Sequence, residues 1–250
     1  MLIYILCQQL KSKNIVIQNK TNHKHQKIMK SLLKKLVAVF ALFLSVSSVC
    51  AQVKGIDVSH YQKNIDGEKV ANAGVDFVYI KATEGATYVD PMFKKNIEGA
   101  KKAKILVGVY HFFRMTSTPE KQFENFKKAM KGYEMDLVPM IDVEVSEKYN
   151  TKEVRKNLDK FIALIKEEYG VPPMIYGTQR SYNTHCAPKY NKYHLYIGRY
   201  GSNPPVIKGE GTYTIWQYTE TGRIDGITEC VDICRFNPKY GIEDIKIKKK

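Results

Sequence analysis

The sequence predicts an α/β fold, an irregular TIM-like β/α barrel with its active site at the C-terminal ends of the strands. From residue 54 onward, apolar runs rich in β-formers alternate with amphipathic helical patterns. Four such β–α units in succession indicate a parallel sheet with right-handed crossovers, and four further strand patterns suggest closure into a barrel. The later connections are short or irregular, so we expect several helices of a regular eightfold barrel to be missing.

The elements of this barrel can be assigned in order from hydrophobic periodicity, caps and breakers. Strand patterns occupy residues 54–59, 76–82, 105–112, 137–144, 174–177, 193–199, 213–218 and 229–235. Helical patterns occupy residues 66–74, 91–104, 117–131 and 151–169. The last of these is the longest: Leu158, Phe161, Ile162 and Ile165 share one face, and Gly170 supplies a stop signal.

The first 51 residues differ in composition from the rest of the chain. They hold eight lysines and no Asp or Glu, so removing them lowers the formal net charge from +15 to +7. A basic stretch from Met29, an apolar run over residues 36–46 and a small-residue site ending at Ala51 together form the pattern of a secretory signal peptide. We therefore expect an upstream extension plus signal peptide over 1–51, with the true start at Met29 and cleavage after Ala51. The less favoured alternative is a lipid anchor at Cys50.

An exported protein, periplasmic or extracellular, then consists of one catalytic domain over 52–240 and a basic tail over 241–250. We expect a monomer with no integral membrane segment after signal removal. Nucleic acid is not an expected partner, because the chain has no basic helix, no zinc-finger spacing and no aromatic RNA-binding motif. No metal or cofactor is expected, since no His/Cys cluster has ligand spacing and no nucleotide-binding loop is present.

The stretch from Leu137 to Glu144 ends an apolar run with two carboxylates, Asp142 and Glu144. Residues two apart in a strand project to the same face, with Cβ atoms roughly 6–7 Å apart. Two ionised acids at that distance repel, so the pKa of one rises. A protonated acid beside an ionised partner is what glycosidic bond cleavage requires. By itself the motif is a weak signal, since such a pair more often marks a strand end running into a solvated turn.

Polar, acidic and aromatic residues at the other strand ends would converge on the same mouth of the barrel. Asp57 and Asp232 come from the first and last strands, which are neighbours in a closed barrel. Aromatic faces suit sugar rings, although such side chains are more often core. The candidate substrate-binding residues are Tyr61, Tyr110, Tyr176, Trp216, Gln217 and Tyr218. His111 and Glu84 are interpreted as structural, with Glu84 paired to Lys81 or to a backbone amide.

An ordered set of motifs resembles family 25 of the glycoside hydrolases, the muramidase-type lysozymes. The segments are Gly55-Ile56-Asp57-Val58-Ser59 with Gln62, residues 80–85, residues 108–112, residues 139–144, Ile175-Tyr176, Trp216-Gln217-Tyr218 and residues 231–236. The likeness covers about residues 54–236. It implies a β/α-barrel-like fold and hydrolysis of the β-1,4 bond between N-acetylmuramic acid and N-acetylglucosamine in peptidoglycan, the expected partner.

The resemblance places the family's acidic residues on Asp57, Asp142 and Glu144, with Asp232 as a further acid at the site. The family usually has Asn at Cys234, Trp at Tyr196 and Ala at Gly198, and none of these departures falls on a carboxylate. We assign Glu144 as general acid and Asp142 as its ionised neighbour, which either steers the N-acetyl group or raises the pKa of Glu144. Asp57 and Asp232 either stabilise charge or activate water, or else hold other site residues by hydrogen bonds.

Two other functions remain open from the residues. One is a cell-wall-binding module that has lost turnover. The other is hydrolysis of chitin-like N-acetylglucosamine polymers, although Leu137 and Met140 stand where the longer chitinase signature has its first two Asp residues.

Three cysteines follow the predicted cleavage site: Cys186, Cys230 and Cys234. Cys230 and Cys234 are too far apart in an extended strand to bond to each other. A disulfide between Cys186 and Cys230 is possible in an oxidising compartment, but we favour three thiols buried as small hydrophobes.

Overall fold

The computed structural model describes Met29 and residues 53–248, and the predicted cleavage site and Cys50 lie outside the described residues. Eight strands form the barrel: β1 (Lys54–Val58), β2 (Phe77–Glu84), β4 (Leu106–Phe112), β5 (Met140–Asp142), β6 (Met174–Thr178), β7 (Leu195–Gly198), β8 (Ile215–Gly222) and β9 (Val231–Phe236). The pairing β1–β2 closes the ring, while the short β3 (Tyr88–Val89) pairs only with the end of β2. The predicted irregular β/α barrel is confirmed.

The last strand departs from the parallel arrangement. Neighbouring barrel strands from β1 through β8 run parallel, whereas β9 is antiparallel to both β8 and β1. Only residues 223–230 join β8 to β9, which is too short for the crossover that a parallel pair requires. The start of β9, rather than its end, therefore lies beside the C-terminal ends of the other strands.

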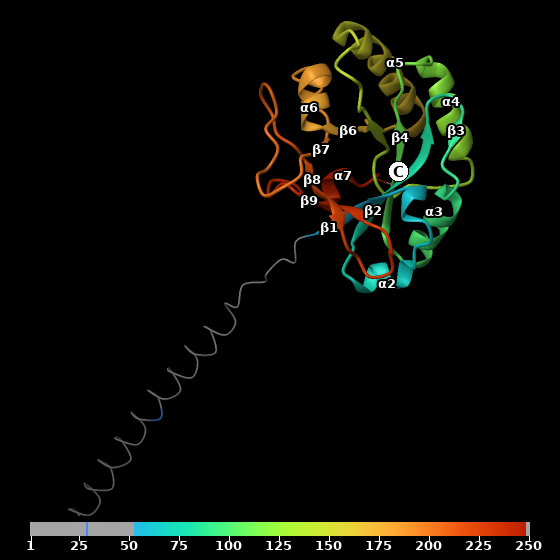
Figure 1. The fold of residues 1–250 in the computed structure, drawn as a ribbon, viewed down its shortest axis with the longest axis vertical. Coiled ribbons are helices and arrows are strands. Elements are labelled where there is room, and N and C mark those ends of the chain that lie inside the picture. Colours follow the sequence, from blue (N-terminus) through green and yellow to red (C-terminus); the bar gives the residue numbers. More distant parts are fainter. Residues whose placement is uncertain (1–28, 30–52, 249–250) are drawn as a thin grey trace, which may run out of the picture. The chain divides into compact units, whose positions relative to one another are not determined.

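The helices cover part of the barrel. They are α2 (Gly67–Asn72), α3 (Phe93–Lys102), α4 (Pro119–Ala129), α5 (Thr151–Tyr169), α6 (Gln179–Ser181) and α7 (Ile242–Ile245), with short helical turns over His60–Gln62 and Tyr182–Cys186. Figure 1 shows α3, α4 and α5 along one side, while β7, β8 and β9 lie on the side without long helices. The expected loss of later helices is thus confirmed.

Local signals explain where the main helices begin and end. Asn150 accepts hydrogen bonds from the first-turn amides of α5, and Gly170 ends that helix in the left-handed conformation at φ 69°. Thr118 caps α4, and Pro119 occupies its first turn, where the missing N–H costs nothing. These caps match the boundaries predicted for both helices within two residues.

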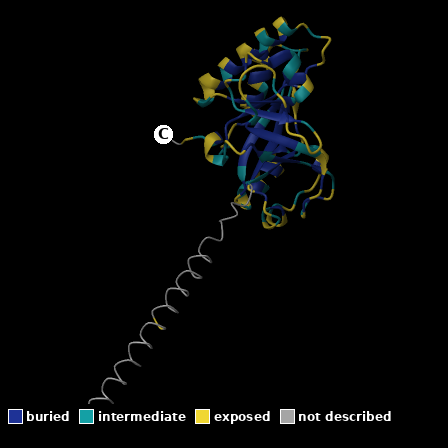
Figure 2. Cartoon of the chain, turned by 90° about the vertical axis from the view of Figure 1, so that its left-hand side faces the viewer, coloured by how far each residue is buried: buried dark blue, intermediate teal, exposed yellow. Residues whose placement is uncertain are grey.

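Two apolar layers hold the barrel together, and buried strands form its centre in Figure 2. Inside the barrel lie Phe77, Tyr79, Met140, Met174, Tyr196, Ile215, Cys234 and Phe236. A larger layer, including Ile80, Val109, Phe126, Phe161 and Ile197, fills the space between the strands and the helices. Alternation along the strands accounts for the division, since successive side chains point to opposite faces.

The segment predicted as a basic tail over 241–250 packs against the barrel in its described part. Ile245 in α7 is 0% exposed and packs inside the barrel beside Leu137 and Val138. The amide of Val138 donates to the carbonyl of Ile245, and the amide of Ile247 donates to that of Asp136. Ile245 and Ile247 thus fix the segment up to residue 248 against the barrel.

The three described cysteines are free thiols, as favoured from the sequence. Cys186 and Cys234 are buried, whereas Cys230 is only half-buried. None of the described helices is both long enough and apolar enough to cross a membrane.

Candidate active site

A pocket of about 230 Å³ opens at the C-terminal ends of the parallel strands. It brings together eight of the ten candidate site residues: Asp57, Tyr61, Tyr110, Asp142, Glu144, Tyr176, Gln217 and Asp232. Four carboxyl groups from β1, β5, the segment after β5, and β9 therefore share one cavity.

Asp142 is the last residue of β5, and Glu144 lies just beyond it. The chain stays attached to its neighbours there, because the carbonyl of Asp142 accepts from Phe113 N at 2.9 Å and Val143 N donates to Tyr176 O at 2.9 Å. These bonds on both sides keep the segment extended past the strand. Asp142 is buried, while Glu144 is exposed at the pocket.

The two carboxyls of this pair hold protons more tightly than isolated acids. Burial raises the pKa of Asp142 well above its usual value, and the charge of Glu144 raises it further. Burial also raises the pKa of Glu144, although Arg114 and Lys81 oppose that shift. The pair therefore retains a proton where separate carboxyls would both be ionised. The deeper burial of Asp142 favours its protonated form, in contrast to the expected ionised neighbour.

Asp57 and Asp232 face each other directly across the antiparallel β1–β9 pair. Burial, followed by repulsion from Asp232, raises the pKa of Asp57 to about 8. Burial, followed by the charges of Glu220 and Glu144, raises the pKa of Asp232 to about 6. Such cross-strand Cβ atoms lie about 5 Å apart, close enough for strong repulsion between two ionised carboxylates.

Asp57 is held in place by two hydrogen bonds to its Oδ2. Gln217 Nε2 donates at 3.0 Å, and the hydroxyl of Tyr196 donates as well. Gln217 in turn accepts from Tyr176 Oη at 2.8 Å. Tyr196, one of the departures from the family pattern, is thus in direct contact with a candidate catalytic carboxyl.

Trp216 and Tyr218 do not line the pocket, which corrects their assignment as substrate-binding residues. Gln217 points inward to Asp57, so its neighbours in β8 point to the outer face of the sheet. The guanidinium of Arg235 lies 4.5 Å from the ring centroid of Trp216 and 5.2 Å from that of Tyr218. Both rings are therefore part of the outer packing of the barrel.

Sequence reasoning missed several residues of the pocket, chiefly Lys81, Tyr200 and Glu220. The sequence did contain a signal for Lys81. It lies on the same face of β2 as Phe77 and Tyr79, which point into the barrel. Glu220 was hidden by a register shift between Gln217 and Thr219, which inverts the alternation along β8. The shift turns Glu220 into the pocket, where its charge raises the pKa of Glu144 and Asp232.

Two other polar residues are structural, as expected from the sequence. His111 is buried, with 2.7 Å between its Nδ1 and Thr83 Oγ1 and 3.0 Å between its Nε2 and Gln122 Oε1. Burial lowers the pKa of His111 to about 4, so its ring is neutral near pH 7. Glu84 accepts from Lys81 Nζ at 2.6 Å. Over the described part of the chain, no group of three or more His, Cys, Asp or Glu side chains could hold a metal ion.

A β/α barrel with five carboxyls at its C-terminal mouth, among them the Asp142–Glu144 pair whose pKa values are raised by burial, has the site of a glycoside hydrolase. Comparison with known proteins agrees: the model of glycosyl hydrolases family 25 matches residues 56–227. The chain belongs to this family of glycoside hydrolases.

Named relatives extend over most of the folded part. Lysozyme M1 of Streptomyces globisporus is 36% identical over 200 residues, covering 74% of this chain and 68% of that protein. The lysozyme structure from Streptomyces coelicolor superposes with a TM-score of 0.70 at 33% identity, over 78% of this chain and 95% of the other. A family 25 glycosyl hydrolase from Bacillus anthracis gives a TM-score of 0.72 at 32% identity, over 78% and 94%.

Proposed function

We propose that this glycoside hydrolase is an exported muramidase that hydrolyses the β-1,4 bond between N-acetylmuramic acid and N-acetylglucosamine in peptidoglycan. The observation that carries the proposal is the Asp142–Glu144 pair, which keeps a proton at the open mouth of a family 25 barrel. The names of the relatives, among them an autolytic lysozyme of Clostridium acetobutylicum, support the same substrate.

Glu144 is the general acid of this proposal. Its side chain is exposed to the pocket, whereas Asp142 is buried below it. Burial raises the pKa of Glu144 and so favours its protonated form, and Glu144 delivers this proton to the oxygen of the leaving sugar as the glycosidic bond breaks. Asp142 supports this step by orienting the substrate from the pocket floor.

Asp232 and Asp57 act on the other side of the bound sugar. The lower pKa of Asp232, about 6, favours its ionised form near neutral pH, so we assign it to stabilise positive charge on the ring or to activate water. Asp57, with a pKa raised to about 8 and two hydrogen bonds to its Oδ2, is assigned to position the groups around it.

Three aromatic residues and one amide are proposed to bind the sugar. Tyr61, Tyr110 and Tyr176 line the pocket, and Tyr61 is the most accessible, at 71% exposed. Gln217 links Asp57 to Tyr176 and so fixes one wall of the pocket. The protein acts as a monomer on cell wall outside the cytoplasm, after residues 1–51 have been removed.

The experiment measures how the protein that begins at Gln52 acts on two polymers, peptidoglycan and chitin. A muramidase clears embedded peptidoglycan in a zymogram and releases little from chitin. A wall-binding module would bind peptidoglycan without clearing it, and a hydrolase of N-acetylglucosamine polymers would prefer chitin. Either of the last two results would overturn the proposal.

A further inference from the structure

A second cavity, of about 570 Å³, adjoins the catalytic pocket and is not explained by the chemistry of bond cleavage. The two cavities share Tyr61 and Lys81 in their walls. The second one, here called the side groove, lies between the segment His60–Tyr61, the β2–β3 turn and the loop after β4. A substrate in the catalytic pocket could therefore extend a branch into the side groove.

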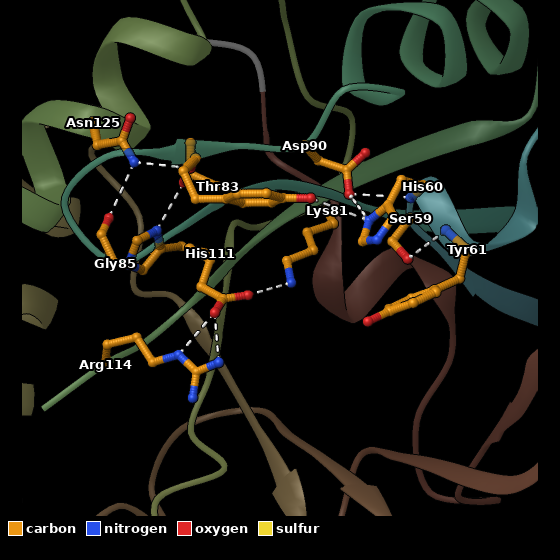
Figure 3. A network of polar contacts seen from close by, with 12 residues as sticks. Ser59, His60, Tyr61, Lys81, Thr83, Gly85, Asp90, His111, Arg114 and Asn125 are labelled. Carbon is orange, nitrogen blue, oxygen red and sulfur yellow. Dashed lines mark hydrogen bonds and ion pairs between the residues drawn. The ribbon is translucent and has the colours of Figure 1, made fainter. Parts of the chain in front are cut away.

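One wall of the side groove carries a surplus of positive charge. Lys81 and Arg114 both bind Glu84: Lys81 Nζ lies 2.6 Å from Oε2, and Arg114 Nε lies 2.9 Å from Oε1. Figure 3 shows Lys81 between Arg114 and Tyr61. Two cations share one carboxylate, so the cluster has a net charge of about +1. Arg114 contacts Glu84 through Nε and Nη2, which leaves Nη1 to bind a ligand, and its side chain is 46% exposed.

The walls of the side groove are fixed in place. Asn125 Nδ2 donates to the carbonyls of Gly85 and Tyr88, each at 3.0 Å, and so holds the β2–β3 turn against α4. On the opposite wall, Asp90 accepts from the amide of His60 at 3.0 Å and contacts its ring Nδ1 at 2.8 Å (Figure 3). A pre-organised wall lowers the entropy cost of binding.

The polar and aromatic lining fits an anionic, peptide-like group better than a neutral sugar. The guanidinium of Arg114 lies 4.4 Å from the ring centroid of Phe112, so the ring orients the cation. Ser117 lines the side groove, and its buried Oγ has no hydrogen-bond partner among the described residues. A carboxylate of the ligand would accept a hydrogen bond from Arg114, and a neighbouring amide of the same ligand would form a hydrogen bond with the Ser117 hydroxyl.

We propose that the side groove binds a carboxylate of the peptide stem that N-acetylmuramic acid carries on its lactyl group. This inference rests on the proposed muramidase function, because only a muramic acid residue in the catalytic pocket would bring such a stem to the side groove. Arg114 is the main anchor through its free Nη1, with Lys81 contributing charge from the shared wall. The groove would thus make the enzyme prefer glycan strands that still carry peptide.

The test compares two substrates prepared from the same peptidoglycan, free of phosphate polymers. One keeps its stems, and the other has lost them to an amidase that cleaves the lactyl–peptide bond. The measured quantity is the ratio of kcat/KM for the stem-bearing strands to that for the stripped strands. We expect Arg114→Gln to lower this ratio about tenfold, because one charge-assisted hydrogen bond is lost.

The ratio also separates this role from an effect of Arg114 on the catalytic acid. Arg114 lowers the pKa of Glu144, so its removal alters the chemical step for both substrates alike and cancels in the ratio. Ser117→Asp, which keeps Arg114 and places a carboxylate in the groove, should lower the ratio as well. Lys127→Gln is the charge-matched control, since Lys127 pairs with Glu168 on the surface between α4 and α5 and should leave the ratio unchanged.

Two results would overturn the inference while leaving the proposed function intact. An unchanged ratio in both Arg114→Gln and Ser117→Asp would show that no stem binds there. An equal loss on both substrates leaves the ratio unchanged and would likewise exclude stem binding, because the effect of Arg114 on Glu144 alone produces such a loss. If the wild-type protein cleaves neither substrate, it is the muramidase function itself that fails.

Discussion

At the scale of single residues, Glu144 carries the proposed chemistry. Glu144→Gln keeps the shape and hydrogen-bonding capacity of the side chain but cannot release a proton. We expect turnover of peptidoglycan to fall by at least about a hundredfold, the usual contribution of a general acid, with an unchanged melting temperature. Initial rates of wall solubilisation measure the effect.

The matched control is Glu124→Gln, which makes the same change on an exposed position of α4 away from the pocket. It should keep full activity. If Glu144→Gln retained the wild-type rate, the general acid would have to be another carboxyl of the pocket.

The raised pKa of Asp57 makes the folding stability of the protein depend on pH. Because this pKa is raised to about 8 in the folded protein, the folded state holds a proton that the unfolded chain loses near the ordinary value of 3.8. The unfolded state is therefore favoured progressively as pH rises between these values. Asp57→Asn removes the ionisation, so the variant should gain stability over the wild type between about pH 4 and pH 7, on the order of a few kcal/mol.

Urea unfolding of both proteins at the two pH values measures this difference. The gain should be small at about pH 4, where Asp57 is mostly protonated in both states. A difference in unfolding free energy that does not change with pH would contradict a raised pKa for Asp57.

The residue scale also shows what the sequence could and could not predict about the site. The position of polar residues at the strand ends was enough to bring Asp142, Asp232 and Gln217 to the mouth of the barrel. Strand alternation failed for Glu220, because the register shift in β8 reverses the alternation after Gln217. Such a shift depends on pairing with β9 and leaves no local mark in the sequence.

At the scale of elements, α7 is the feature that sequence reasoning missed most clearly. Lysines dominate the end of the chain, so its composition indicated a basic tail, but the buried Ile245 and the backbone hydrogen bonds of Ile245 and Ile247 fix it to the barrel. Ile245→Ala should lower the free energy of unfolding by about 2–4 kcal/mol, because it opens a cavity inside the barrel. Glu243→Ala, an exposed position on the same helix, should change stability little. Equal stabilities of the two variants in urea would contradict the packing of α7.

The direction of β9 likewise could not be predicted from the pattern of its residues. Periodicity identifies a strand but not its orientation, which here follows from the short connection over residues 223–230. The antiparallel direction nevertheless leaves Asp232 at the mouth, because this residue lies near the start of its strand. Because β9 pairs antiparallel with β1, Asp57 and Asp232 lie directly opposite each other.

At the scale of the whole molecule, the barrel is stabilised by packing rather than by a covalent crosslink. Cys186 lies in the layer between the barrel and the helices, whereas Cys234 lies inside the barrel. We expect the protein that begins at Gln52 to expose three thiols per chain when unfolded without reductant, matching the free cysteines of the structure. Thiol titration in guanidinium measures this number. One thiol per monomer would instead demonstrate a disulfide.

The order of strands and helices was largely predictable because each β–α unit carries its own caps and periodicity, as α5 with Asn150 and Gly170 illustrates. What required the structure were features set by contacts between distant segments, such as the closure of β1 on β9 and the side groove formed around Arg114.

The most direct test of the central claim is the identity of the new reducing end. Purified peptidoglycan is digested with the protein that begins at Gln52, and the soluble fragments are reduced and identified by mass spectrometry. Cleavage of the proposed bond leaves N-acetylmuramic acid at the reducing end of every glycan fragment, and Glu144→Gln should release almost none. Fragments that end in N-acetylglucosamine, or equal release by the variant, would contradict the account.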